Sequence, residues 1–368
     1  MDAFASAVST NPDAGVAARE ACDAVRTSLG GAAPDLAVVF ATPDLMANAP
    51  GIAAIIEGSL GPGALIGCTA EGVIATGREV ERPPALALWA AVLPGGPVGA
   101  FALDPARDAV PRGEGAVILL ADPFSFPPEA LREPDGTAMP GVVVGGMASG
   151  GRQPGDHRLL VDGVVRSGGA VGVLVPGARA VVSQGCRPVG PEMTITEGGD
   201  GIIVELAGKP ALQRVREVVQ SLPDDERALV EQGVLAGLVV DGNKPQLEQG
   251  DFLVRGILGG DPDTGAMAVG EDVRVGQVMR LQVRDHASAH DDLQRALADV
   301  PAGTARGALM FTCNGRGTRM FPEPDHDAAL AAQVLGPVPL AGMFCNGEIG
   351  PVGGRVHPHG FTATMAIF

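Results

Sequence analysis

The chain has 368 residues, 46% of them hydrophobic, which is enough for two ordinary globular domains with sizeable cores. Its 43 acidic and 26 basic residues give a net charge of −17, which excludes the basic face needed for nucleic acid and disfavours a bare anionic membrane surface. With 11 Phe, one Trp and no Tyr, the core must be built from Val, Leu, Ile and Ala, a composition typical of buried strands covered by helices.

The cysteines and the opening residues indicate the compartment. Five cysteines, an odd number scattered along the chain, do not form a disulfide framework and favour a reducing environment. The opening residues, MDAFASAVST, carry an acid at Asp2 and lack the basic leader of a secretion signal. No apolar run approaches the roughly 20 residues that a membrane helix needs. We therefore expect a soluble, cytoplasmic protein with no membrane partner.

Helical and strand patterns alternate from the start of the chain. The first five predicted elements are helix, strand, helix, strand and strand, over residues 13–29, 35–40, 50–60, 64–66 and 85–93. The first helix is closed by Gly30-Gly31, and the strand at 64–66 ends at Gly67. Among these, the strand at 35–40, the helix at 50–60 and the strand at 64–66 form a strand–helix–strand unit.

A second copy of this unit is predicted in the middle of the chain. A strand at 116–121, a helical turn at 128–132 and a strand at 142–144 end at Gly145-Gly146. Residues 158–165 and 170–175 then read as a hairpin-like pair across Ser167-Gly168-Gly169. A degenerate further copy is predicted from Lys209 through strands at 239–240 and 252–254, continuing to 281–283.

The end of the chain repeats the order found at its beginning. The predicted elements are strand, helix, strand and strand, over residues 308–312, 325–335, 338–341 and 361–368. With one gap, GCTAEGVI overlays GMFCNGEI, so that Gly72 pairs with Gly347 and Ile74 with Ile349. The sequence therefore predicts an α/β fold of two related halves, built from duplicated strand–helix–strand units with sheets covered by helices.

Several separated segments carry a family resemblance. GCTAEGVIATGREVE, GGMASGG, SQGCRPVGP and GMFCNGEIGPVGGRVHPHGF resemble the FIST domain in both its N-terminal and C-terminal parts, from about Asp35 to Phe368. With a boundary in the glycine-rich stretch 198–201, we expect a FIST N-terminal domain over 1–200 and a FIST C-terminal domain over 201–368. The resemblance implies a sensory domain of signal-transduction proteins that binds small ligands such as amino acids. Relatives often carry kinase, cyclase or receptor output modules. No residues remain for one here, so we expect a separate output protein.

Glycines at strand ends are the first candidate site. Gly67-Cys68-Thr69, Gly145-Gly146 with Ser149, and the segment 342–347 could expose backbone N–H groups to a carboxylate or phosphate. The alternative is that these glycines permit tight turns or close strand packing. None of the three matches a nucleotide-binding motif, so no cofactor is predicted.

Cysteines and charged residues are the second source of candidates. Four cysteines lie at or just beyond predicted strand ends, namely Cys68, Cys186, Cys313 and Cys345. Reactive chemistry would need a histidine in reach, whereas buried structural thiols are commoner, and the absence of a CxxC pair argues against zinc. Glu71 and Glu348 flank the aligned glycines and could receive a ligand ammonium group. Arg158, Arg255 and Arg316 could clamp a carboxylate, and Arg255 interrupts the apolar run FLVRGIL.

The sequence thus predicts reversible binding of an amino acid or similar small metabolite. The predicted pocket lies where the three glycine-containing strand ends converge, near the interface of the halves. The candidate ligand-binding residues are Gly67, Cys68, Thr69, Gly146, Ser149, Arg255, Asn314, Cys345, Asn346 and Glu348. No catalytic residue, metal or cofactor is predicted. Two other classes stay open: a cysteine-dependent enzyme that uses Cys345 or Cys68 on a small acyl or amide substrate, and a ligand-free interaction scaffold.

Overall fold

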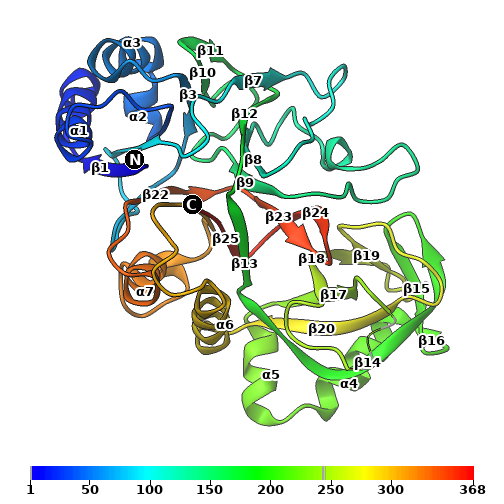
Figure 1. The fold of residues 1–368 in the computed structure, drawn as a ribbon. Helices are drawn as coiled ribbons and strands as arrows, with labels where there is room; N and C mark the ends of the chain where they lie inside the picture. Colours follow the sequence, from blue (N-terminus) through cyan, green and yellow to red (C-terminus); the bar gives the residue numbers. More distant parts are fainter. Residues whose placement is uncertain (1, 243, 245) are drawn as a thin grey trace. The chain divides into compact units, whose positions relative to one another are not determined.

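The computed structural model describes residues 2–242, 244 and 246–368 as a mixed α/β protein (Figure 1). The chain divides into two compact units. Unit 1 comprises Met1–Val182, Leu293–Pro358 and Thr362–Phe368, and unit 2 comprises Ser183–Asp292 and His359–Phe361. Within the described ranges, no helix is both long enough and apolar enough to cross a membrane.

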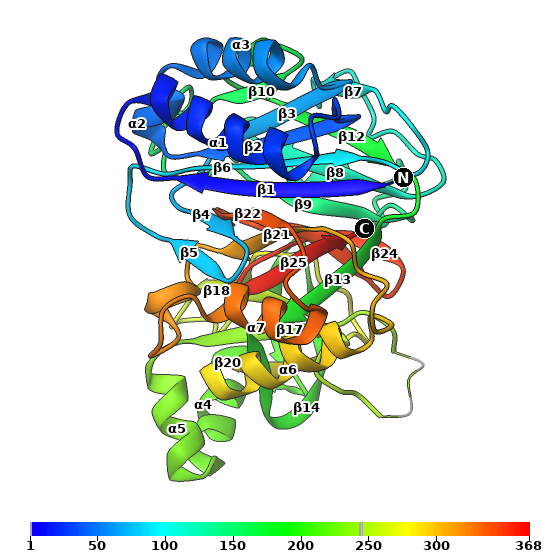
Figure 2. The ribbon, with the colours of Figure 1, turned by 60° about the vertical axis from the view of Figure 1, so that its left-hand side comes forward.

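The first sheet of unit 1 has the strand order β1-β6-β2-β3-β10-β11. Its strands are β1 (Ala3–Ser9), β2 (Leu36–Ala41), β3 (Ala64–Thr69), β6 (Leu86–Val92), β10 (Leu159–Val161) and β11 (Val164–Arg166). β2 and β3 run parallel, and the other neighbours are antiparallel. One face of the sheet is covered by α1 (Ala14–Ser28), α2 (Pro43–Met46) and α3 (Ala49–Leu60), and Figure 2 shows α1 and α3 lying across it.

The second sheet of unit 1 has the strand order β24-β23-β9-β8-β12-β7. Its strands are β7 (Ala100–Leu103), β8 (Ala116–Ala121), β9 (Val143–Met147), β12 (Ala170–Val175), β23 (Glu348–Val352) and β24 (Arg355–His359). β8 and β9 are parallel. The outer face packs against η1 (Pro128–Leu131) and loop residues such as Phe126 and Met139. The helical turn predicted at 128–132 is thus η1, and loops rather than longer helices cover the rest of this face.

The third sheet of unit 1 has the strand order β13-β25-β21-β22-β4-β5. Its strands are β4 (Val73–Ala75), β5 (Arg78–Val80), β13 (Arg179–Gln184), β21 (Ala308–Cys313), β22 (Leu340–Cys345) and β25 (Thr362–Ile367). β21 and β22 are parallel. The outer face packs against α7 (His326–Leu335) and the last turns of α6 (His286–Ala298), and η2 (Gly317–Arg319) follows β21.

The inner faces of the three sheets share one hydrophobic core. In β2, Leu36, Val38 and Phe40 point into this core, whereas the alternate residues face the helices, as the period of two in a strand requires. The Phe40 and Phe311 rings meet edge to face, with 5.9 Å between their centroids. The core thus joins strands from both ends of unit 1 in sequence.

A glycine lies at a matching place in each of the three parallel strand pairs. A Cβ atom built on Gly67, Gly145 or Gly342 would lie 2.4, 1.8 or 2.0 Å from a carbonyl oxygen of the neighbouring strand. Those oxygens belong to the registered partner residues, Val39, Leu119 and Met310. These glycines therefore let two backbones approach more closely than any side chain would permit.

Unit 2 is built from antiparallel strands. They are β14 (Cys186–Gly199), β15 (Ile202–Leu206), β16 (Lys209–Pro210), β17 (Val234–Val239), β18 (Phe252–Gly260), β19 (Met267–Val269) and β20 (Val278–Arg284). The order β14-β20-β17-β18-β19-β15 closes into a ring because β14 also pairs with β15. Helix α4 (Ala211–Ser221) packs Val218 into the hydrophobic core of this ring, and α5 (Asp224–Glu231) follows.

Two predictions of strand pairing are wrong. Residues 158–165 and 170–175 do not pair: β10 and β11 form the hairpin across Asp162 and Gly163, and β12 joins the second sheet. Asp162 and Gly163 both have positive φ, 43° and 75°, as a two-residue hairpin turn requires. The further strand–helix–strand copy after Lys209 is also absent from the described residues, since β17 and β18 are antiparallel neighbours within the ring.

Substituting alanine at Gly342 tests the close approach of parallel strands. We expect Gly342→Ala to lower the free energy of unfolding by about 2 kcal/mol or more, because the new methyl group must displace the Met310 carbonyl. Gly58→Ala in α3 is the matched control, since nothing lies within 4 Å of a Cβ there. The control should be neutral or stabilising by about 0.5–1 kcal/mol. Urea unfolding measures both, and equal midpoints would contradict the prediction.

Candidate functional site

Several predicted residues meet where strands of unit 1 end. We call this region the corner, and it comprises residues 67–72, 146–149, 314–319 and 344–348. The Ser149 hydroxyl donates to the Phe344 carbonyl at 2.5 Å and accepts the Glu71 N–H at 2.7 Å. The Ser149 N–H donates to the Thr69 carbonyl at 3.2 Å. Ser149 therefore ties the ends of β3 and β22 to the segment that follows β9.

The segments after β21 and β22 complete the corner. The Asn314 N–H donates to the Cys345 carbonyl at 2.9 Å, and the Asn346 N–H donates to the Met147 carbonyl at 3.1 Å. A cavity of about 20 Å³ lies here, lined by Glu71, Gly72, Glu81, Asn314, Arg319 and Phe344. Of the ten candidate residues, Asn314 is the one that lines this cavity.

An exposed ion pair lies at this cavity. One Arg319 Nη donates to Glu71 Oε1 at 2.5 Å, and the other donates to the Asn314 carbonyl at 2.5 Å. The Arg319 side chain is 57% exposed and that of Glu71 34% exposed. The pair with Glu71, set against partial desolvation, raises the pKa of Arg319. Sequence reasoning missed Arg319, whose signal was a second arginine in CNGRGTRM.

Most other candidate residues at the corner are buried and make contacts within the protein. Gly67 lies in β3 against Val39, and the Cys68 sulfur is 3.2 Å from the Met343 sulfur. A Cβ on Gly146 would lie 2.3 Å from the Cys345 sulfur. Burial raises the pKa of both the Cys68 and Cys345 thiols, which opposes formation of a nucleophilic thiolate.

Arg255 lies in unit 2, whereas the residues of the corner belong to unit 1. Its guanidinium forms an ion pair with Glu271 at 2.8 Å, and both side chains are about nine-tenths buried, with exposed fractions of 10% and 11%. The charge within FLVRGIL is thus neutralised by a neighbour in the same unit, which is how a partly buried arginine is usually accommodated.

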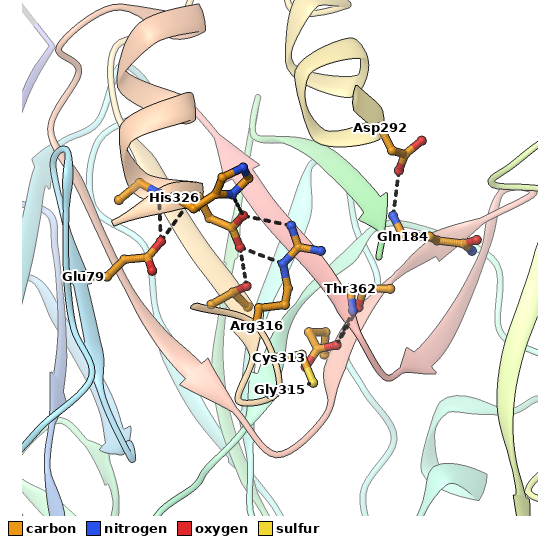
Figure 3. A network of polar contacts seen from close by, with 12 residues as sticks. Glu79, Gln184, Asp292, Cys313, Gly315, Arg316, His326 and Thr362 are labelled. Atoms are coloured by element: carbon orange, nitrogen blue, oxygen red, sulfur yellow. Dashed lines mark hydrogen bonds and ion pairs between the residues drawn. The ribbon is translucent and has the colours of Figure 1, made fainter. Parts of the chain in front are cut away.

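Arg316, another possible carboxylate clamp in the sequence, binds a carboxylate of its own chain. Its guanidinium is fully buried and contacts Asp327 through two bonds of 2.7 and 2.8 Å (Figure 3). The guanidinium carbon also lies 5.1 Å from the centre of the Phe321 ring. Burial opposes ionisation of Asp327, but the charge and hydrogen bonds of Arg316 prevail and lower its pKa.

Two further carboxyl groups of unit 1 are buried near this ion pair. Glu79 of β5 accepts the N–H groups of Asp327 and Ala328 at 2.8 and 3.0 Å, and so caps the start of α7 (Figure 3). Glu348 accepts the N–H and the hydroxyl of Thr362 at 3.1 and 2.6 Å. Burial raises the pKa of each carboxyl to about 8, and the negative charge of Asp327 adds to the effect on Glu79.

A serine, an aspartate and a histidine are also linked in unit 1, but in an order that does not activate the serine. The Ser125 hydroxyl donates to one Asp122 oxygen at 2.6 Å, and His157 Nδ1 lies 2.8 Å from the other. His157 Nε2 accepts the Gly151 N–H at 3.1 Å. A nucleophilic serine needs the imidazole, not the carboxylate, as its partner. The group instead anchors the loop around Gly151.

A second cavity of about 450 Å³ lies elsewhere in unit 1. It is lined by Asp104, Pro105, Ser125, Val165, Arg166, Ser167, Gly168 and Gly169. None of these residues was a candidate in the sequence. Among the described residues, no group of three or more His, Cys, Asp or Glu side chains is arranged to hold a metal ion.

The fold and the corner define a two-part α/β protein whose strand ends carry closely packed polar groups, and comparison with known proteins names its family. Residues 35–209 match the FIST N domain, and residues 211–351 match the FIST C domain. The chain belongs to the FIST family, whose domains are generally sensory domains of signal transduction.

Relatives in mycobacteria cover nearly the whole chain. Uncharacterized proteins of Mycobacterium tuberculosis strains CDC 1551 and H37Rv are each 46% identical over 382 residues, covering 98% of this chain and 98% of their own. An uncharacterized protein of Mycobacterium bovis is 46% identical over 383 residues, covering 98% of this chain and 97% of its own.

The raised pKa of Glu348 predicts a pH-dependent stability. The folded state holds this proton more tightly than the unfolded state, so its stabilising effect is complete below the ordinary glutamate pKa and is lost as pH rises through about 8. We expect the wild-type free energy of unfolding to fall from about pH 5 to about pH 8, and to fall less in Glu348→Gln. Urea unfolding across this range measures it, with exposed Glu114→Gln as the control. An identical slope in Glu348→Gln and wild type would refute the assignment.

The Arg316–Asp327 ion pair predicts a large effect of removing one partner. Asp327→Ala leaves a fully buried guanidinium without its carboxylate, so the free energy of unfolding should fall by about 3–5 kcal/mol. Asp23→Ala removes the partner of Arg26 from an exposed pair and should cost about 0–1 kcal/mol. Thermal or urea unfolding compares the two variants. Similar losses in both would contradict the role given to burial.

Proposed function

We propose that this chain is a small-ligand-binding sensory protein, and that its ligand is an amino acid or a similar small zwitterion bound at the corner. Membership of the FIST family supports a sensory role. The observation that carries the choice of ligand is the exposed Arg319–Glu71 ion pair at the corner cavity, beside Asn314.

A zwitterion matches this pair in charge and spacing. An α-amino acid carries a carboxylate and an ammonium group on adjacent carbons, so one molecule can satisfy two opposite charges that lie side by side. The ligand carboxylate binds the planar guanidinium of Arg319 through paired hydrogen bonds. The ligand ammonium binds Glu71, and the Asn314 side chain offers an amide donor and acceptor.

The energetic cost of exchanging partners is small. An exposed ion pair contributes about 0–1 kcal/mol, so the protein loses little when Arg319 and Glu71 turn from each other to a ligand. The cavity of about 20 Å³ holds roughly one water molecule, so both side chains must swing outward to admit a ligand. The Glu71 backbone stays anchored to Ser149 during this movement.

The remaining candidates at the corner do not contact the ligand in this proposal but hold the surrounding segments in place. Thr69, Ser149 and Asn346 fix the strand ends that form its wall, through backbone and hydroxyl hydrogen bonds. The other candidates of unit 1 are buried and unavailable to a ligand at this cavity, namely Gly67, Cys68, Gly146, Cys345 and Glu348. Arg255, paired with Glu271 in unit 2, is not part of the proposed site.

We also propose how the chain arose and how it signals. The three parallel strand pairs, each with a glycine against a neighbouring carbonyl, support descent from one duplicated strand–helix–strand unit. The FIST N-terminal and C-terminal domains divide at 200/201, in the turn after β14. A separate cytoplasmic output protein reads the ligand state, since a ligand favours whichever conformation binds it better.

A thermal-shift screen with the twenty amino acids tests the proposal. A specific amino acid should raise the melting temperature of the wild type, because a ligand that binds the folded state stabilises it by mass action. Arg319→Ala and Glu71→Ala should each abolish that shift. Arg26→Ala, which also breaks an exposed ion pair, should leave it unchanged. The proposal fails if no amino acid raises the melting temperature, or if the shift survives in Arg319→Ala.

A further inference from the structure

The larger cavity of unit 1 has the size and the walls of a ligand site. Its volume of about 450 Å³ falls within the range of small-molecule pockets. Its walls come from the end of β7, the Ser125 turn, the end of β11 and the loop at 167–169. None of its lining residues lines the corner cavity, so the two sites are separate.

Arg166 is the distinctive residue of this cavity. Its Nε is shut off from solvent and, within the part of the chain that the structure describes, has no hydrogen-bond partner. Nor does an acidic residue of that part form an ion pair with its guanidinium. A buried guanidinium nitrogen without a partner costs free energy, and such a group in a native protein calls for an explanation. Arg166 itself lines the cavity, and its guanidinium carries further N–H groups that a ligand anion there can accept.

The loop after Arg166 forms another wall of the cavity and is fixed by Ser125. Ser167 is exposed beside the cavity, and a Cβ on Gly168 would lie 2.9 Å from the Ser125 hydroxyl. Gly169 has a φ of 76°, and its N–H donates to Ser125 at 2.8 Å. Both glycines thus pack too closely against Ser125 and Leu103 for a side chain to fit, and the Ser125 hydrogen bond holds the loop in place.

The charges around the cavity restrict the class of anion. Asp104 also lines it, paired only at 3.7 Å with the exposed Arg107, and the chain carries a net charge of −17, so a second negative charge on the ligand would be repelled. We propose that this cavity binds a small monocarboxylate, with its carboxylate on Arg166 and a hydroxyl or ammonium group toward Asp104. A guanidinium suits a carboxylate because its fork of N–H groups matches the two oxygens.

Isothermal titration calorimetry at constant ionic strength tests this site, with lactate as the monocarboxylate probe and inorganic phosphate as the dianion. We expect lactate to bind with a millimolar dissociation constant, and Arg166→Gln to weaken it at least about tenfold. Arg78→Gln is the matched control, because Arg78 also lies on an edge strand of unit 1, and it should bind lactate as the wild type does. Arg319→Ala should also bind lactate normally, which separates this site from the corner.

Asp104→Asn supplies a second variant that does not depend on the folding of Arg166→Gln. Removing the Asp104 charge should strengthen phosphate binding more than lactate binding. The proposal is overturned if lactate gives no binding heat, if Arg166→Gln or Asp104→Asn leaves both affinities unchanged, or if phosphate binds the wild type more tightly than lactate.

Discussion

The close approach of parallel strands at three glycines is the constraint on which unit 1 depends. Gly67, Gly145 and Gly342 each lie against a neighbouring carbonyl oxygen, at distances that no Cβ could occupy. Each parallel pair is therefore tightly coupled, and the inner faces of all three sheets meet in one core. The polar groups of the corner lie at the ends of these strands and are joined there by hydrogen bonds between the segments. Glycines that the sequence offered as ligand contacts thus have a packing role in the structure.

Burial decides which polar groups of unit 1 are available to a ligand. Arg316 and Asp327 are shut inside the protein and neutralise each other, whereas Arg319, three residues after Arg316, is exposed and bound to Glu71. The two arginines occupy the same turn and differ in what surrounds them. The interior pair therefore contributes to structure, and the exposed pair can exchange partners at little cost.

Sequence patterns predicted the elements of unit 1 well because their signals are local. Asp13 caps α1, and Gly30 and Gly31 follow its end in left-handed conformations, as the sequence indicated. Pairing was harder, because an apolar run does not tell which strand it joins. The Asp162-Gly163 turn was overlooked in favour of Ser167 to Gly169, and the antiparallel ring of unit 2 was mistaken for another α/β copy. The family resemblance, carried by long specific motifs, was confirmed.

The candidate site was predicted less well, since exposure is a property of the whole fold. Residue type singled out Cys345 and Glu348, which are fully buried, and overlooked Arg166 and Arg319.

The sequence order of unit 1 has a consequence for synthesis. Residues 183–292 form unit 2 and separate the first two thirds of unit 1 from β21, β22 and β25, while Trp89 packs on Phe368 with 4.9 Å between ring centroids. During synthesis the apolar inner faces of the early strands stay exposed, because β21, β22 and β25 leave the ribosome last. We therefore expect unit 1 to complete its core only after the last strands have been synthesised.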